Sequence, residues 1–219
     1  MVAVAAALVR PPMARAAVSC PPTLAGADPR LGGIEAEARL AWIDEHLART
    51  AARARWWTWA WGLGIGGSGV ASLAVVPSVE RSARVDWYTS AGSAAIGVVP
   101  LVVAPLKVVR DARELHAGLA AHAPGAPPAL EVCPLLADAE ARLVRDAADQ
   151  RDQQRWWFHA GNLAFNTGVA LFLGLGFHHW TSGIINGVAG AAVGEALILT
   201  QPTGTIDDLG AYRAGQLGP

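Results

Sequence analysis

Three long stretches of the chain carry no Asp, Glu, Lys or Arg, and they constrain the fold more than any other feature. They run from Trp56 to Val79, from Trp87 to Leu106 and from Trp156 to Gly194. A helix needs about 20 apolar residues to cross the hydrocarbon core of a bilayer, which is about 30 Å thick. The stretches therefore predict an all-α membrane protein with four transmembrane helices. These spans are expected at residues 56–77, 87–106, 156–177 and 180–201.

Composition and tryptophan placement agree with this interpretation. Charged residues make up 16% of the chain, against about 25% in ordinary soluble proteins, and the mean hydropathy is +0.31. Eight of the nine tryptophans lie at the beginnings of the predicted spans, where interfacial aromatic residues are expected. The lipid bilayer is therefore the expected partner of the chain. The protein is expected to be a multi-pass protein of a bacterial inner membrane.

An internal repeat covers almost the whole chain. Arg55-Trp56-Trp57 returns as Arg155-Trp156-Trp157, and an Ala-Glu-Ala-Arg-Leu motif at 36–40 returns at 139–143. A period of about 100 residues indicates a tandem duplication. Since each copy contains two spans, both helix hairpins should enter the membrane in the same, parallel orientation. The expected units are a leader at 1–33, a first repeat at 34–120, a Pro-rich linker at 121–132 and a second repeat at 133–219.

Charged, amphipathic helical extensions are expected next to the spans. In the stretch 34–55, Leu40, Ile43 and Leu47 recur at intervals of three and four residues, which predicts one apolar helix face. Residues 107–119 and 135–155 are also expected to be charged helices. His178-His179 is expected to form a very tight turn between the last two spans. The residues after 201 are expected to be a polar tail, and residues 1–33 to form no folded element.

The N-terminus and the two cysteines give conflicting indications of orientation. Ala14-Arg15-Ala16 resembles a signal-peptidase site, and the alternatives are a disordered leader or a misplaced start. Cys20 and Cys133 each precede a proline at the head of a repeat, which predicts a disulfide and an oxidising compartment. Lys and Arg, however, are concentrated on the side of the charged helices, and the positive-inside rule places that side in the cytoplasm. Sidedness is therefore left open by the sequence.

The second repeat carries polar residues inside its spans, and these form the candidate site. A shared depth of about 8–9 Å is expected for Asn162 and Glu195, from the helical rise of about 1.5 Å per residue. Buried ionisable groups in membranes are often functional. Two interpretations are open: a hydrogen-bonded clamp between helices, and a substrate or proton site. The proposed intramembrane cluster consists of His159, Asn162, Asn166, Asn186 and Glu195.

Small residues form two rows on the fourth predicted span. Such rows let helix backbones approach closely, which favours association of helices in a membrane. Both packing within the bundle and self-association of two copies, or association with another protein, fit the pattern. The helix-packing glycines are Gly183, Gly187, Gly190 and Gly194.

Other classes of function find no support in the sequence. The net charge of −1, with no basic stripe, argues against nucleic-acid binding. The six histidines form no metal-binding motif, no nucleophile motif occurs, and the G-x-G-x-x-G match at 62–67 lacks the preceding strand of a dinucleotide site. We therefore expect no catalytic residues, no metal, no cofactor and no enzyme. The expected role is structural or scaffolding, and the alternative is a small transporter or ion-conducting subunit that uses the polar cluster.

Overall fold

The computed structural model describes residues 18–121 and 128–218, and this part of the chain contains helices and no β-strand. The α-helices are α1 (Ala36–Val75), α2 (Arg84–Val103), α3 (Lys107–Ala121), α4 (Pro128–Gln153), α5 (Trp156–Phe177), α6 (Trp180–Leu199) and α7 (Gly204–Arg213). Two short 3-10 helices are η1 (Pro29–Gly33) and η2 (Val76–Ser78). The prediction of an all-α fold is confirmed.

Four helical segments are long and apolar enough to cross a membrane, as the charge-free stretches predicted. They contain α1, α2, α5 and α6, respectively. In the most apolar window of each segment, only 17% of the residues are buried inside the protein. These apolar surfaces would be unfavourable in water, and a bilayer would cover them.

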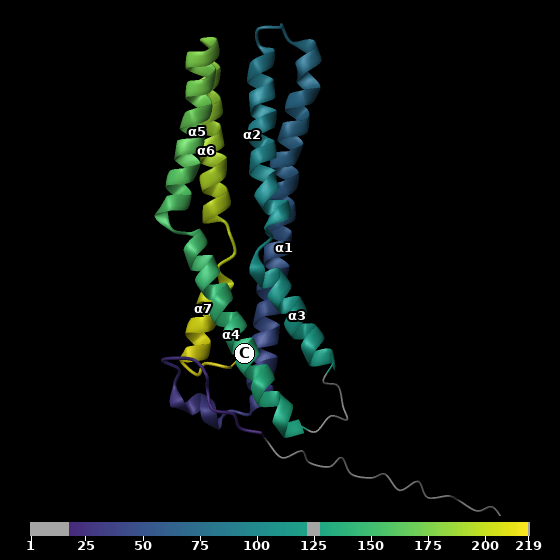
Figure 1. Ribbon diagram of the computed structural model, residues 1–219, viewed down its shortest axis with the longest axis vertical. Helices are drawn as coiled ribbons and strands as arrows, with labels where there is room; N and C mark the ends of the chain where they lie inside the picture. Colours follow the sequence, from purple (N-terminus) through teal and green to yellow (C-terminus); the bar gives the residue numbers. More distant parts are fainter. Residues whose placement is uncertain (1–17, 122–127, 219) are drawn as a thin grey trace, which may run out of the picture.

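The four segments form two helical hairpins that point the same way (Figure 1). In the first hairpin α1 packs against α2, and in the second α5 packs against α6. The second turn is as tight as expected, because only His178 and His179 separate α5 from α6. His178 takes a left-handed backbone conformation (φ 63°), which ends α5 sharply.

The other end of the molecule is a separate helical domain, composed of residues 18–55, 107–121, 128–155 and 200–218 (Figure 1). It contains the first half of α1 together with α3, α4 and α7. Apolar residues at helical spacing on these helices form one buried core. The core includes Leu40, Ile43, Leu47, Leu115, Leu136, Leu143 and Leu209. The expected charged helices are therefore present, and they bury one face against each other.

Three boundaries differ from the sequence-based expectation. Residues 18–33 are part of the helical domain, since Leu31 is fully buried and η1 forms at 29–33. The linker is shorter than 121–132, because α4 begins at Pro128, and proline fits the first turn of a helix. The tail is not merely polar: α7 buries Thr205, Leu209 and Tyr212, which share one helix face. Its short length and two glycines concealed this periodicity.

Candidate functional site

A chain of polar contacts joins α5 to α6 within the second hairpin. His159 Nδ1 lies 2.5 Å from Glu195 Oε2, and Asn162 Nδ2 donates to Glu195 Oε1 at 2.9 Å. The Asn162 amide also donates to the backbone carbonyl of Ala191, and Asn166 donates to the Asn162 side chain at 2.8 Å. The structure thus brings together four of the five residues in the proposed cluster. His159 and Glu195 keep 31% and 28% of their side-chain surface exposed, so the pair lies at the edge of the hairpin.

Asn186 does not join this chain of contacts. Its side-chain oxygen accepts a hydrogen bond from Ser90 of α2 at 2.6 Å, and its amide donates to the carbonyl of Ser182. Nine residues separate Asn186 from Glu195, which places them on opposite faces of α6 and about 13 Å apart along it. The expectation that Asn186 belongs to the same cluster is therefore wrong. It links the two hairpins instead.

The four helix-packing glycines all face α5. A side chain at Gly183 would meet the carbonyl oxygen of Ala170, and one at Gly187 would lie 2.9 Å from the carbonyl oxygen of Asn166. Side chains at Gly190 and Gly194 would overlap the amides of Asn166 and Asn162. In this structure the glycine rows therefore serve packing within the hairpin, and the absence of side chains lets the asparagine amides reach across to α6.

A cleft of about 570 Å³ lies between the two hairpins and is lined by all four membrane-spanning helices. The sequence-based prediction covered only polar residues of the second repeat, so it missed the residues of the first repeat that line this cleft. Serines at intervals of three and four residues on α1 and α2 could have indicated them. The polar residues that line the cleft are Ser68, Ser72, Ser90, Ser93, Asn162, Asn166 and Asn186. Asp, Glu, Lys, Arg and His are absent from this lining in the described part of the chain.

Hydrogen bonds join the hairpins near both ends of the cleft. Near the turns, Ser90 donates to Asn186, and His179 Nδ1 lies 2.8 Å from Asp86 Oδ1. Near the helical domain, the indole nitrogens of Trp57 and Trp61 donate to the Thr200 hydroxyl at 3.1 and 3.0 Å. The hairpins are therefore connected at their ends and separated between them.

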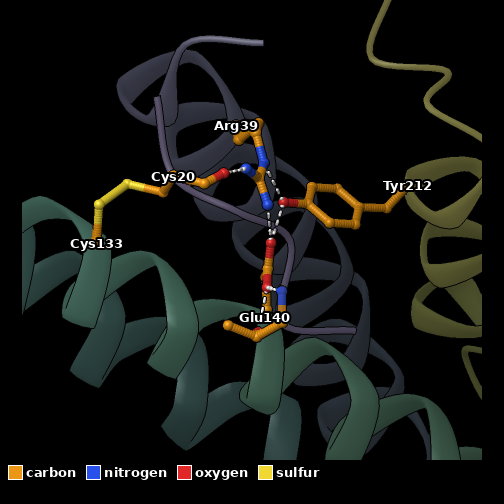
Figure 2. Close-up of a disulfide and its surroundings, with 6 residues drawn as sticks. Cys20, Arg39, Cys133, Glu140 and Tyr212 are labelled. Atoms are coloured by element: carbon orange, nitrogen blue, oxygen red, sulfur yellow. Dashed lines mark hydrogen bonds and ion pairs between the residues drawn. A yellow bond between two sulfur atoms is a disulfide. The ribbon is translucent and has the colours of Figure 1, made fainter. Parts of the chain in front are cut away.

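The helical domain contains the predicted disulfide between Cys20 and Cys133, which is confirmed (Figure 2). The two Cα atoms lie 5.6 Å apart, inside the usual range for a disulfide. Cys133 lies within α4, and Cys20 is a buried residue of the segment that precedes η1. The bond therefore joins the two halves of the chain far from the membrane hairpins.

A fully buried ion pair lies beside this disulfide (Figure 2). The Arg39 guanidinium pairs with Glu140, donates to the Cys20 carbonyl at 2.7 Å and donates to the Tyr212 hydroxyl at 2.9 Å. The Tyr212 hydroxyl in turn donates to Glu140 at 2.7 Å, and burial followed by this hydrogen bond raises the pKa of Tyr212. Glu140 also accepts from the backbone nitrogen of Thr23. In the sequence, Arg39 and Glu140 belong to the two copies of the repeated motif, and nothing in that pattern indicates that they pair.

A second buried acid in the helical domain lacks such compensation. Asp146 on α4 is 1% exposed, and neither carboxylate oxygen receives a hydrogen bond from the described residues. Burial raises the pKa of Asp146 to about 7, and the charges of Asp111 and Asp149 act in the same direction. Asp146 is therefore close to half-protonated near neutral pH.

No metal-binding group is found where the structure is described: residues 18–121 and 128–218 contain no cluster of three or more His, Cys, Asp or Glu suited to a metal ion. The glycines at 62–67 lie inside α1, so this stretch is helical and not a phosphate-binding loop.

Fold and site together define the class: a helical protein with four helices suited to crossing a membrane and a disulfide-linked helical domain at one end. The chain matches no protein-family model, no curated protein and no solved structure.

Proposed function

We propose that the protein is a non-catalytic membrane scaffold, in which two membrane hairpins carry a rigid helical domain that presents a surface to other proteins. The observation that carries this proposal is the composition of the domain's core. Residues from both halves of the chain meet there through the Cys20–Cys133 disulfide and the Arg39–Glu140 pair. This arrangement favours a fixed shape.

The buried charged groups of the helical domain bond to one another, which supports a structural role over a catalytic one. Arg39, Glu140 and Tyr212 satisfy one another in an enclosed site, so they are not presented to a substrate. A buried pair of this kind adds little net stability, but it disfavours any arrangement that separates the partners. We infer that the network fixes how α1, α4 and α7 pack together.

The architecture also supports a tandem duplication. In the first half, the hairpin α1–α2 is flanked by the charged first part of α1 and by α3. In the second half, the hairpin α5–α6 is flanked by α4 and α7. We propose that each half descends from one ancestral hairpin with charged helical extensions.

The proposed location is a bacterial inner membrane, with the helical domain on the oxidising side. The disulfide supports this side, because structural disulfides persist in the periplasm and are rare in the cytosol. The proposal opposes the positive-inside rule, which places the basic residues of the domain in the cytoplasm. A cleaved signal peptide would reconcile the two, because it would export the segment that follows it.

Site-specific photocrosslinking in living cells tests the scaffold proposal. A photoreactive amino acid would replace exposed residues of the helical domain, such as Glu37 and Arg151, and Arg81 in the turn after η2 would serve as the matched control. We expect the domain positions to give discrete crosslinked products that are retained through purification. Arg81 should give different products or none. A domain surface that yields no product at any exposed position would contradict the scaffold.

A second candidate function, transport of protons or small cations, rests on the His159–Glu195–Asn162 contacts. His159 lies about 5 Å inside the span from Trp156, so these are ionisable groups within the membrane region, where such groups are often functional. Proteoliposomes loaded with a pH-sensitive dye separate the two candidates. Proton flux that is lost in Glu195→Gln would favour transport, and flux no greater than that of empty liposomes would favour the scaffold.

A further inference from the structure

The cleft between the hairpins is a slot that extends along the membrane-spanning helices. On α6 its lining residues run from Asn186 to Ile198, which corresponds to about 18 Å at the helical rise of about 1.5 Å per residue. Its volume is about 570 Å³, and all four membrane-spanning helices contribute to its lining.

The volume of the slot suits a small ligand. Binding sites for small molecules typically measure about 300–1,000 Å³ and combine an apolar lining with a few polar groups. The hydrogen bonds from Ser90 to Asn186 and from Trp61 to Thr200 join the hairpins near the two ends of the slot. They oppose both collapse and widening of the cleft, so its width is fixed by the fold.

Polarity is distributed unevenly along the slot. Ser90 lies about 5 Å from Trp87, and Asn186 about 9 Å from Trp180, both measured from the face of the hairpin turns. Ser72 lies about 24 Å from Trp56 at the opposite face, which puts it at a similar depth in a core of about 30 Å. The turn end of the slot is therefore polar. The end near the helical domain is lined mainly by apolar residues, among them Trp61, Leu101 and Leu197. Asn162 is the polar residue at this end, and its amide already donates to the Ala191 carbonyl and to Glu195.

The polar end offers hydrogen bonds without charge. The hydroxyl protons of Ser72 and Ser90 are already donated, to the Ser68 carbonyl and to Asn186, so their oxygens remain free to accept. The Asn186 amide donates to the Ser182 carbonyl and has a second N–H to offer. Such a set suits a ligand head that carries hydroxyl groups, and it cannot neutralise a phosphate or a carboxylate.

We propose that this slot binds one hydrocarbon chain of a neutral, hydroxyl-bearing lipid of the monoacylglycerol kind. The hydroxylated head contacts Ser72, Ser90 and Asn186, and the chain runs along the slot toward Trp61. The ligand enters from the leaflet at the hairpin turns. This binding site is independent of the surface by which the helical domain would contact other proteins.

Photolabelling of the full-length protein in lipid nanodiscs tests the proposal. The probes are a monoacylglycerol and a phosphatidylglycerol, each with a diazirine in the acyl chain, followed by peptide mass spectrometry. We expect the monoacylglycerol to label peptides that line the slot and to be displaced by excess unlabelled monoacylglycerol. Equal labelling by both probes, labelling spread over all faces of the spans, or crosslinks to a second protein chain at the slot would overturn the proposal.

Two neighbouring positions on α6 give a matched pair of variants. Ala189 lines the slot, whereas Val188 is exposed and does not line it. We expect Ala189→Trp to reduce slot labelling at least tenfold and Val188→Trp to leave it unchanged. Ser93→Phe fills the slot from α2 and serves if Ala189→Trp does not fold. Labelling that persists in both slot-filling variants would refute the site.

The head contacts are tested separately with Asn186→Leu. Loss of its hydrogen bonds should weaken monoacylglycerol binding about tenfold, whereas a probe that carries the same chain on a hydrocarbon head should bind both proteins equally. An equal loss for both probes would show that Asn186 only maintains the shape of the slot, and the proposed recognition of the head would be wrong.

Discussion

Asp146 provides a quantitative test of the helical domain, because it is a buried carboxyl group without a hydrogen-bond donor. Its pKa is raised from 3.8 to about 7, chiefly by burial and then by Asp111 and Asp149. Between these two values the folded protein holds a proton that the unfolded chain has lost. The contribution of Asp146 to the free energy of unfolding must therefore fall as the pH rises from about 4 to about 7. Above about pH 7 this contribution stays constant.

The replacement Asp146→Asn removes this penalty while keeping the size of the side chain. Each pKa unit corresponds to about 1.4 kcal/mol, so ionised Asp146 destabilises the folded protein by about 4 kcal/mol relative to an uncharged group. The variant should match the wild type near pH 4 and exceed it by about 4 kcal/mol above pH 7. For a chain of this size, that gain raises the melting temperature by roughly 10 °C.

Thermal unfolding of both proteins in one detergent, followed by circular dichroism from pH 4 to pH 9, provides the measurement. Asp152→Asn is the matched control, because Asp152 is an exposed carboxylate on the same helix, for which we expect a change within about 0.5 kcal/mol. The reasoning is refuted if the gap between Asp146→Asn and the wild type is absent, or if it does not vary with pH.

Three further predictions concern the disulfide and the second hairpin. Cys20→Ser should lower the free energy of unfolding by about 2–5 kcal/mol, as measured by chemical denaturation; two freely alkylated thiols in freshly isolated wild-type membranes would contradict the native bond with Cys133. Gly187→Leu should eliminate the folded species in size-exclusion chromatography, since a side chain there meets α5, whereas Gly168→Leu has open space and should be tolerated; equal behaviour of the two would exclude close packing as the cause. Glu195→Gln should change stability by less than about 1 kcal/mol, because its amide oxygen still accepts from Asn162; a loss above about 3 kcal/mol would point instead to an essential buried charge pair.

The membrane-spanning segments could be predicted closely from the sequence. α5 runs from Trp156 to Phe177, as the absence of charges and the position of the tryptophans indicated, and α6 begins at Trp180 as expected. A bilayer imposes the same requirement on every spanning helix: about 20 consecutive apolar residues with all backbone groups paired internally. That requirement is local, so it can be recognised in one continuous stretch of residues.

The disulfide could also be predicted, for a different reason. The chain has only two cysteines, so a disulfide within one chain has only one pairing. The contact between Asn162 and Glu195 followed from depth, because the helical rise converts residue number into position along the membrane normal. The depth argument covered only these two residues. Asn186 lies about 13 Å from Glu195 along α6 and on its opposite face, so it contacts α2 instead.

The remaining features depend on how distant helices pack. Arg39 meets Glu140 and Tyr212 only because α1, α4 and α7 converge in the helical domain. The slot between the hairpins likewise exists because the two hairpins are joined near its ends, by Ser90 to Asn186 and by Trp61 to Thr200, and are separated between them. The periodicity of one segment shows which face is apolar, but the partner of that face depends on contacts between segments about 100 residues apart. Hydrophobicity and helical period therefore specify the spans, and long-range packing specifies the buried network and the slot.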